Sequence, residues 1–173
     1  MKTRTVHLSM WGAMTAMSLS LTVAEDALIP AGLFPIPGFR LGLANIVILI
    51  AVYLFGALPS IGIVLLRTTA VLAFGGNLSA FLFSLCGGLL AVLIMLALRR
   101  TRQFSLFGIS AGGAAAHSVG QILAAVLLTG SSQLFFYLPF LMWASIAAGL
   151  LVALIAVPVY RAIEVFIRAP RSN

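Results

Sequence analysis

The sequence predicts an all-α integral membrane protein, folded as a bundle of six transmembrane helices with both termini in the cytoplasm. Apolar residues make up 62% of the 173 residues and charged residues only 8%, whereas roughly a quarter of a soluble domain is charged. The apolar residues run in stretches of about 20, the length of a membrane-crossing helix. Eight of the ten cations fall in three clusters that flank these stretches: Lys2 and Arg4; Arg99, Arg100 and Arg102; Arg161, Arg168 and Arg171.

Each predicted span has a recognisable boundary. The connection after the first span contains Pro and Gly at 30–38, and Pro59 opens the third span, because a first helical turn tolerates Pro. Residues 75–77 form a short turn before the fourth span, and Gly130 ends the fifth. Backbone polar groups must be satisfied internally in hydrocarbon, so the spans are helices, and they lack the alternation of barrel strands. The predicted spans are residues 6–26, 41–57, 60–76, 79–98, 106–129 and 135–158.

Orientation follows from the clustered cations. Lys and Arg gather in cytoplasmic loops, and six spans bring all three clusters to that face. Glu25, Asp26 and Arg40 then lie outside. The two acids also argue against a secretory signal cleaved within 22–27, because cleavage regions contain small residues. We expect one membrane domain over residues 1–173, in which the clustered cations only orient the helices.

Composition also narrows the class of function. The net charge of +7 needs no nucleic-acid partner, because basic loops beside membrane helices account for it. The chain lacks the Gly-x-x-x-x-Gly-Lys-Ser/Thr phosphate loop, and its three acids are too few to hold the magnesium that diphosphate chemistry needs. His7 and His117 stand apart, which disfavours a zinc site, and Cys86 is the single cysteine. We therefore expect no enzyme activity, no metal and no cofactor.

Arg67 is the most informative residue, because it lies well inside the third span. Burying a guanidinium there costs about 2.5–3.5 kcal/mol, so it needs a partner. Two interpretations stay open: a structural bond to helix carbonyls or to Glu25 or Asp26, and a bond to an anionic group or carbonyl of a ligand. His117 and Gln121 are four residues apart, so they share one face of the fifth helix and indicate either a polar cavity wall or a bond between helices.

Two further features lie toward the outer face. Asn45, about one turn into the second span, is a candidate ligand contact, and Asn77 is expected to cap the fourth helix. The connection at 32–42 is apolar, aromatic and rich in Pro and Gly, which suits either a lid over an outward-facing pocket or a loop in the membrane interface. The candidate lid residues are Phe34, Pro35, Pro37 and Phe39.

Two helices carry small residues at every fourth position, and such faces let helices approach closely. The ladder on the first helix consists of Gly12, Ala16, Ser20 and Ala24. The ladder on the fifth consists of Gly108, Gly112, Ala116, Gly120 and Ala124. We expect such ladders to pack within the bundle, and the first-helix ladder is also a candidate docking surface for a separate membrane subunit.

Several segments together resemble a known family. Residues 35–47, Pro-Ile-Pro-Gly-Phe-Arg-Leu-Gly-Leu-Ala-Asn-Ile-Val, resemble the P-x-P-G-x-(K/R)-L-G-L-A-N signature of a bacterial membrane family, and residues 81–88 and 116–121 resemble its later blocks. One departure is Ser118, where the family pattern has Asn. The family is labelled heptaprenyl diphosphate synthase component I, or Gx transporter. It is similar to the S components, the substrate-binding subunits of energy-coupling factor (ECF) transporters.

The transporter label implies an S-component-like fold and a subunit that captures a small molecule, such as a vitamin or another precursor, from outside the cell. It implies a multi-pass protein of the bacterial cytoplasmic membrane. Its expected partners are an ECF coupling membrane subunit, docked at Gly12, Ala16 and Ser20, and ATPase subunits. The expected ligand contacts are Arg40, Asn45, Arg67, His117 and Gln121. The other label implies an alternative, a membrane partner or anchor of a prenyl (heptaprenyl) diphosphate synthase with no transport role.

Overall fold

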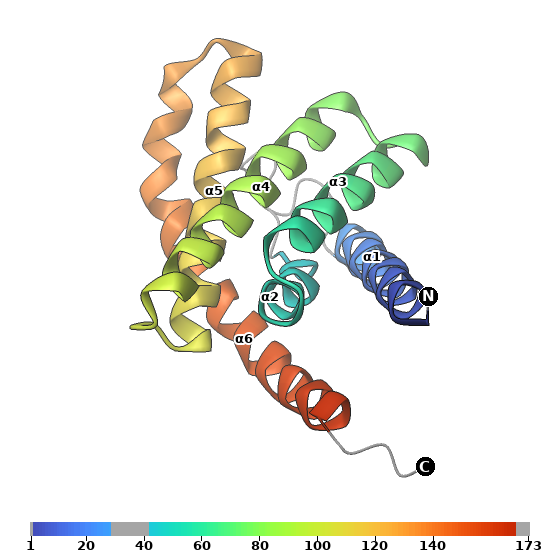
Figure 1. The fold of residues 1–173 in the computed structure, drawn as a ribbon. Helices are drawn as coiled ribbons and strands as arrows, with labels where there is room; N and C mark the ends of the chain where they lie inside the picture. The colour runs from blue at the N-terminus through green and yellow to red at the C-terminus, as the bar shows by residue number, and fades with distance from the viewer. Residues whose placement is uncertain (1, 29–41, 169–173) are drawn as a thin grey trace.

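The computed structural model describes residues 2–28 and 42–168, and these residues form helices joined by short turns (Figure 1). No strand occurs within these two ranges. The elements in chain order are α1 (Lys2–Leu28), α2 (Asn45–Leu54), α3 (Ala57–Ala73), α4 (Leu78–Thr101), α5 (Leu106–Thr129), the short 3-10 helix η1 (Ser132–Tyr137) and α6 (Leu138–Arg168).

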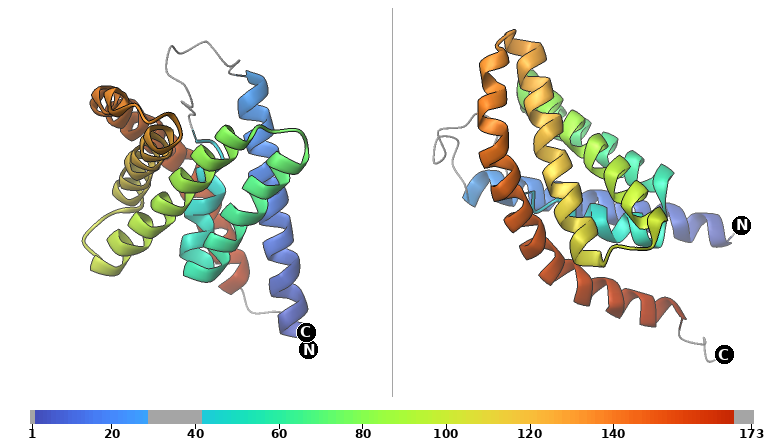
Figure 2. Two further views of the ribbon diagram at one scale, coloured as in Figure 1. Left: turned by 90° about the horizontal axis from the view of Figure 1, so that it is seen from above. Right: turned by 90° about the vertical axis from the view of Figure 1, so that its left-hand side faces the viewer.

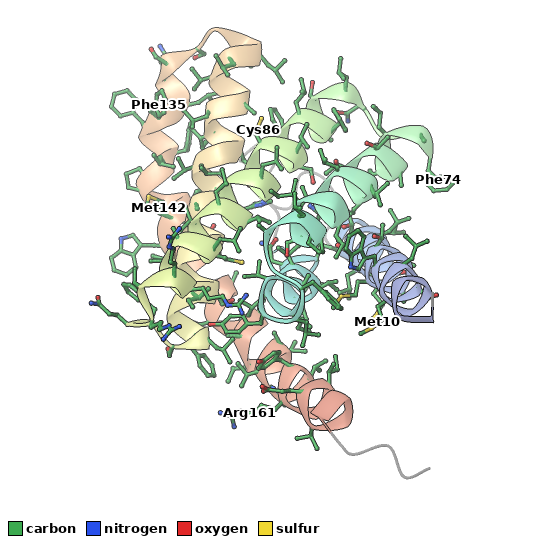
Figure 3. The ribbon with its side chains drawn as sticks, in the orientation of Figure 1. Met10, Phe74, Cys86, Phe135, Met142 and Arg161 are labelled. Atoms are coloured by element: carbon green, nitrogen blue, oxygen red, sulfur yellow. The ribbon has the colours of Figure 1, made fainter. Side chains whose placement is uncertain are left out.

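Three helical segments are long and apolar enough to cross a membrane: Leu78–Thr101, Leu106–Thr129 and Ser132–Val165. The first two agree closely with the predicted spans at 79–98 and 106–129. Large apolar side chains also cover outer surfaces, and Phe74 and Phe135 point outward in Figure 3. The protein is therefore a helical membrane protein.

Helix α2 is shorter than the span predicted at 41–57. Its ten residues rise about 15 Å, half of a hydrocarbon core of roughly 30 Å. Positive φ angles at Gly42 (79°) and Gly56 (83°) place turns on either side of it. Every residue from Asn45 to Val52 is buried, and α1, α3, α4 and α6 all contact the helix. The apolar run at 41–57 thus reflects burial inside protein, which hydropathy alone does not separate from burial in lipid.

Local capping explains where two of the long helices begin. The Asn77 side chain accepts a 2.7 Å hydrogen bond from the backbone N–H of Ala80, which confirms the predicted cap of α4. Ser105 caps α5 in the same way by accepting from the N–H of Gly108. Such side chains satisfy N–H groups that the first helical turn leaves without an intrahelical partner.

Helices α3, α4, α5 and α6 pack in chain order, and α1 lies against α3 (Figures 1 and 2). Helices α5 and α6 form a long antiparallel hairpin, and α6, which contains Pro158, curves along its length (Figure 2). The N-terminal end of α1 and the C-terminal end of α6 lie on the same side of the molecule (Figure 2). The bundle thus places α2 and the middle of α4 near its centre.

Small residues set the closest helix contacts. A Cβ atom added at Gly120 would lie 2.6 Å from the backbone oxygen of Cys86, and Cys86 lies where α4 faces α5 (Figure 3). A Cβ added at Gly149 of α6 would lie 2.9 Å from the backbone oxygen of Ser110 in α5. The small residue Gly120 of the fifth-helix ladder therefore packs within the bundle, as predicted.

Charged side chains hold both ends of α2. The Glu25 carboxylate accepts hydrogen bonds from the N–H groups of Gly42 (2.8 Å) and Leu43 (2.9 Å), just before the helix starts. The Arg99 guanidinium donates to the backbone oxygen of Val52 near the helix end and lies 4.9 Å from the ring centroid of Tyr53. An anion at the start and a cation at the end both suit the helix dipole. The prediction that clustered cations only orient the helices is therefore wrong for Arg99.

Candidate functional site

Arg67 lies in the C-terminal half of α3 and is 3% exposed. Its side chain reaches α1, where Nη1 lies 3.5 Å from the hydroxyl oxygen of Thr22. Thr22 is buried as well, and its hydroxyl donates to the backbone oxygen of Ser18 one turn earlier. The guanidinium thus lies inside the protein between helices, as the sequence required of a charge in an apolar helix.

Gly87 and Gly88 of α4 bring the predicted polar residues to one level of the bundle. A Cβ atom added at Gly88 would lie 3.4 Å from Arg67 Nη2. One added at Gly87 would lie 2.9 Å from His117 Cε1 and 3.0 Å from Gln121 Cγ. Adjacent glycines on α4 therefore let Arg67 approach from α3 while His117 and Gln121 approach from α5.

His117 and Gln121 are each 5% exposed, and they lie one turn apart on α5, so the structure confirms that they share a buried face. Ser118, where the resembled signature has Asn, is also buried and shares a short hydrogen bond with Ser145 of α6. Residue 118 thus ties α5 to α6, while His117 and Gln121 face α4.

Asn45 and Glu25 form a neighbouring polar group at the start of α2. Asn45 is 4% exposed, and a Cβ atom added at Gly42 would lie 2.8 Å from its side-chain nitrogen. Glycine is therefore required at position 42 for two reasons: its φ is positive, at 79°, and the Asn45 amide leaves no room for a Cβ atom. Glu25 lies one turn after Thr22 on α1, so the α2 start and Arg67 contact the same face of that helix.

These side chains define the chemistry that the region offers. Arg67 lies beside Gly88 and reaches Thr22, whereas His117 and Gln121 lie beside Gly87. We call these four residues, Thr22, Arg67, His117 and Gln121, the polar cluster. A guanidinium, an imidazole and an amide donate hydrogen bonds, which suits carboxylates, phosphates and carbonyls. Within residues 2–28 and 42–168, no group of three His, Cys, Asp or Glu side chains is placed to hold a metal ion.

The remaining predicted residues divide into two sets. The ligand contact Arg40 and the lid residues Phe34, Pro35, Pro37 and Phe39 lie outside the described ranges. Gly12, Ala16 and Ser20 are exposed on one face of α1, and nothing lies within 4 Å of a Cβ added at Gly12. The expectation that the first-helix ladder packs within the bundle is therefore wrong, and its docking role stays a prediction.

Sequence reasoning missed Thr22 and the role of Glu25. It named Glu25 as a partner for an arginine, whereas the structure places both carboxylate oxygens on backbone N–H groups. Gly87 and Gly88 belong to the block at 81–88 that resembles the family, and that resemblance gives them no role. A double glycine inside a long apolar helix is a signal that could have located the contact, because it costs helix stability without a packing reason.

The fold and the polar cluster define a helical membrane protein with charged and polar groups buried among its helices. The sequence profile of the family described as heptaprenyl diphosphate synthase component I matches residues 14–159. This match covers most of the chain, so the protein belongs to that family. The chain matches no curated protein and no solved structure.

Proposed function

We propose that the protein is the substrate-binding membrane subunit of an ECF-type uptake transporter. In this proposal it captures a small molecule from outside the cell, a micronutrient such as a vitamin or a biosynthetic precursor. The supporting observation is the polar cluster, in which buried Arg67 packs against Gly88 while buried His117 and Gln121 pack against the adjacent Gly87.

The cost of burial supports a ligand role for this cluster. Placing a guanidinium among membrane helices costs about 2.5–3.5 kcal/mol even on insertion scales. A purely structural bond between helices is available from far smaller groups, as the Ser118–Ser145 pair illustrates. A carboxylate, phosphate or carbonyl of a ligand makes use of the charge and of the planar donor geometry.

The topology in this proposal is six passes through a bacterial cytoplasmic membrane, with both termini in the cytoplasm. The three cation clusters support this orientation. The ends of α1 and α6 on one side of the molecule are compatible with an even number of passes (Figure 2). The shorter helices α2 and α3 would take part in two of the passes, with α2 enclosed by its neighbours.

The exposed face of α1 is the proposed docking surface for an ECF coupling membrane subunit, which would join the protein to ATPase subunits. Gly12, Ala16 and Ser20 present almost no side chain, so a partner helix can approach closely. A leucine side chain at position 16 would occupy the space that the partner helix needs. Ala16→Leu should abolish co-purification of a coupling subunit while small-molecule binding stays intact, and retained association would rule this surface out.

The family description supports a second candidate, a membrane partner of a prenyl diphosphate synthase with no transport role. This candidate needs no small-molecule site and predicts that a soluble synthase co-purifies with the protein. The transport proposal predicts that coupling and ATPase subunits co-purify instead. Identification of the proteins captured with the tagged full chain from its own membranes separates the two.

Uptake by whole cells tests the transport proposal. Cells that depend on the protein for a labelled compound should lose most of that uptake with Arg67→Ala. The matched control is Arg161→Ala, which removes an exposed arginine of α6 that points away from the bundle (Figure 3). Equal uptake by the two variants, at equal protein levels in the membrane, would contradict the proposal.

A further inference from the structure

An open cavity of about 440 Å³ lies at the C-terminal end of α4, about three helical turns after Gly88. Three arginines, Arg99, Arg100 and Arg102, and one leucine, Leu96, line it. Small-molecule sites have volumes of roughly 300–1,000 Å³, so the cavity is large enough for a small anionic group.

The backbone brings the three arginines together. Arg99 is held in place, because its guanidinium donates to the backbone oxygen of Val52 and lies over the Tyr53 ring. Arg102 ends α4 with a φ of 57° and donates its backbone N–H to the oxygen of Arg99 at 3.2 Å. Residues other than Gly rarely adopt this left-handed backbone conformation. The chain therefore turns back at Arg102 and places this cation beside the other two.

An apolar strip of α4 leads to the cavity. Leu93, Ala97 and Arg100 are exposed and lie at intervals of four and three residues, so they follow one face of the helix. Leu96 continues that face into the cavity wall. A ligand that fits has an anionic head among the arginines and an apolar tail along the helix.

We propose that this cavity binds the phosphate of an acidic phospholipid, whose acyl chain lies along Leu93 and Ala97. Guanidinium groups bind phosphate oxygens through paired hydrogen bonds, and basic pockets beside membrane helices bind anionic lipid headgroups. The apolar strip favours a lipid over a soluble phosphate, because a soluble anion has no tail to cover it. The proposal is independent of transport, since it uses none of the residues of the polar cluster.

Native mass spectrometry of the full chain in detergent micelles tests this site. Phosphatidylglycerol and phosphatidylcholine with the same acyl chains are titrated into separate samples of the protein, and the two affinities are compared. Phosphatidylglycerol carries the net negative charge and phosphatidylcholine does not. Phosphatidylglycerol should bind more tightly. A basic residue near the membrane surface contributes about 1 kcal/mol to anionic lipid binding, so Arg100→Gln with Arg102→Gln should weaken it roughly 30-fold.

The controls and the opposing outcomes are as follows. The control Arg161→Gln removes an exposed arginine that does not line the cavity, and it should leave binding unchanged. If the double variant does not keep the wild-type helical circular dichroism, Arg100→Gln alone should still weaken binding about fivefold. Wild-type affinity in the folded variants, or equal affinity for both lipids, would overturn the site. Inorganic phosphate that binds the lipid-free protein and displaces phosphatidylglycerol would overturn the assignment to a lipid.

Discussion

Replacing Glu25 with alanine removes both acceptors that hold the start of α2. The Glu25 carboxylate accepts from the N–H groups of Gly42 and Leu43 and is only 3% exposed. Hydrogen bonds to a charged group contribute about 1.5–3 kcal/mol each, and the bond to Leu43 counts toward the lower end, because it is only partly buried. Glu25→Ala should therefore lower the free energy of unfolding by about 3–5 kcal/mol.

Two companion variants sharpen this measurement. Glu25→Gln keeps one acceptor oxygen and loses the charge, so its loss should lie between those of alanine and wild type. Ser20→Ala changes an exposed residue on the same helix and should have almost no effect. The assay is unfolding in mixed micelles of increasing SDS content, followed by circular dichroism. A loss below about 1 kcal/mol for Glu25→Ala, the worth of one ordinary hydrogen bond, would refute the claim that this carboxylate anchors α2.

Two further predictions concern contacts between helices. Gly120→Ala should destabilise the protein by about 1–3 kcal/mol, because its Cβ meets the backbone of Cys86, while Gly62→Ala on α3, with open space around it, should be neutral or stabilising. The same SDS assay checks this difference, and equal losses would contradict it. Arg99→Gln should cost about 1.5–3 kcal/mol by removing the charged donor to Val52, which Arg100→Gln should not do. A larger loss for the Arg100 variant would contradict the role given to Arg99.

Some helix bounds could be predicted from the sequence and others could not. The bounds of α4 and α5 follow from long apolar runs with a capping residue or a glycine at an end, as Asn77 and Gly130 illustrate. The length of α2 does not follow, because an apolar run looks the same whether lipid or protein covers it. Its bounds depend on two turns and on Glu25, which is 17 residues away from Gly42 in the chain.

For the candidate site, the residues could be predicted from the sequence and their arrangement could not. Arg67, His117 and Gln121 were predicted because a polar side chain in an apolar helix needs a partner or a pocket. Their positions beside Gly88 and Gly87 depend on how α3 and α5 pack against α4, and no spacing within one helix encodes this. The bond of Arg99 to α2 is equally a tertiary contact, and the positive-inside pattern predicted only an orienting role for this cation.

The proposed function requires that the polar cluster binds a small molecule. Native mass spectrometry of the full chain, incubated with the small-molecule pool of its own cells, tests this requirement. We expect a bound compound of defined mass, which the Arg67→Gln variant loses and the Arg161→Gln variant retains, with both variants folded by circular dichroism. The His117→Ala variant should bind the same compound more weakly. If the wild type binds nothing from that pool, or if the Arg67→Gln variant retains the compound fully, the polar cluster is not a binding site for a small molecule.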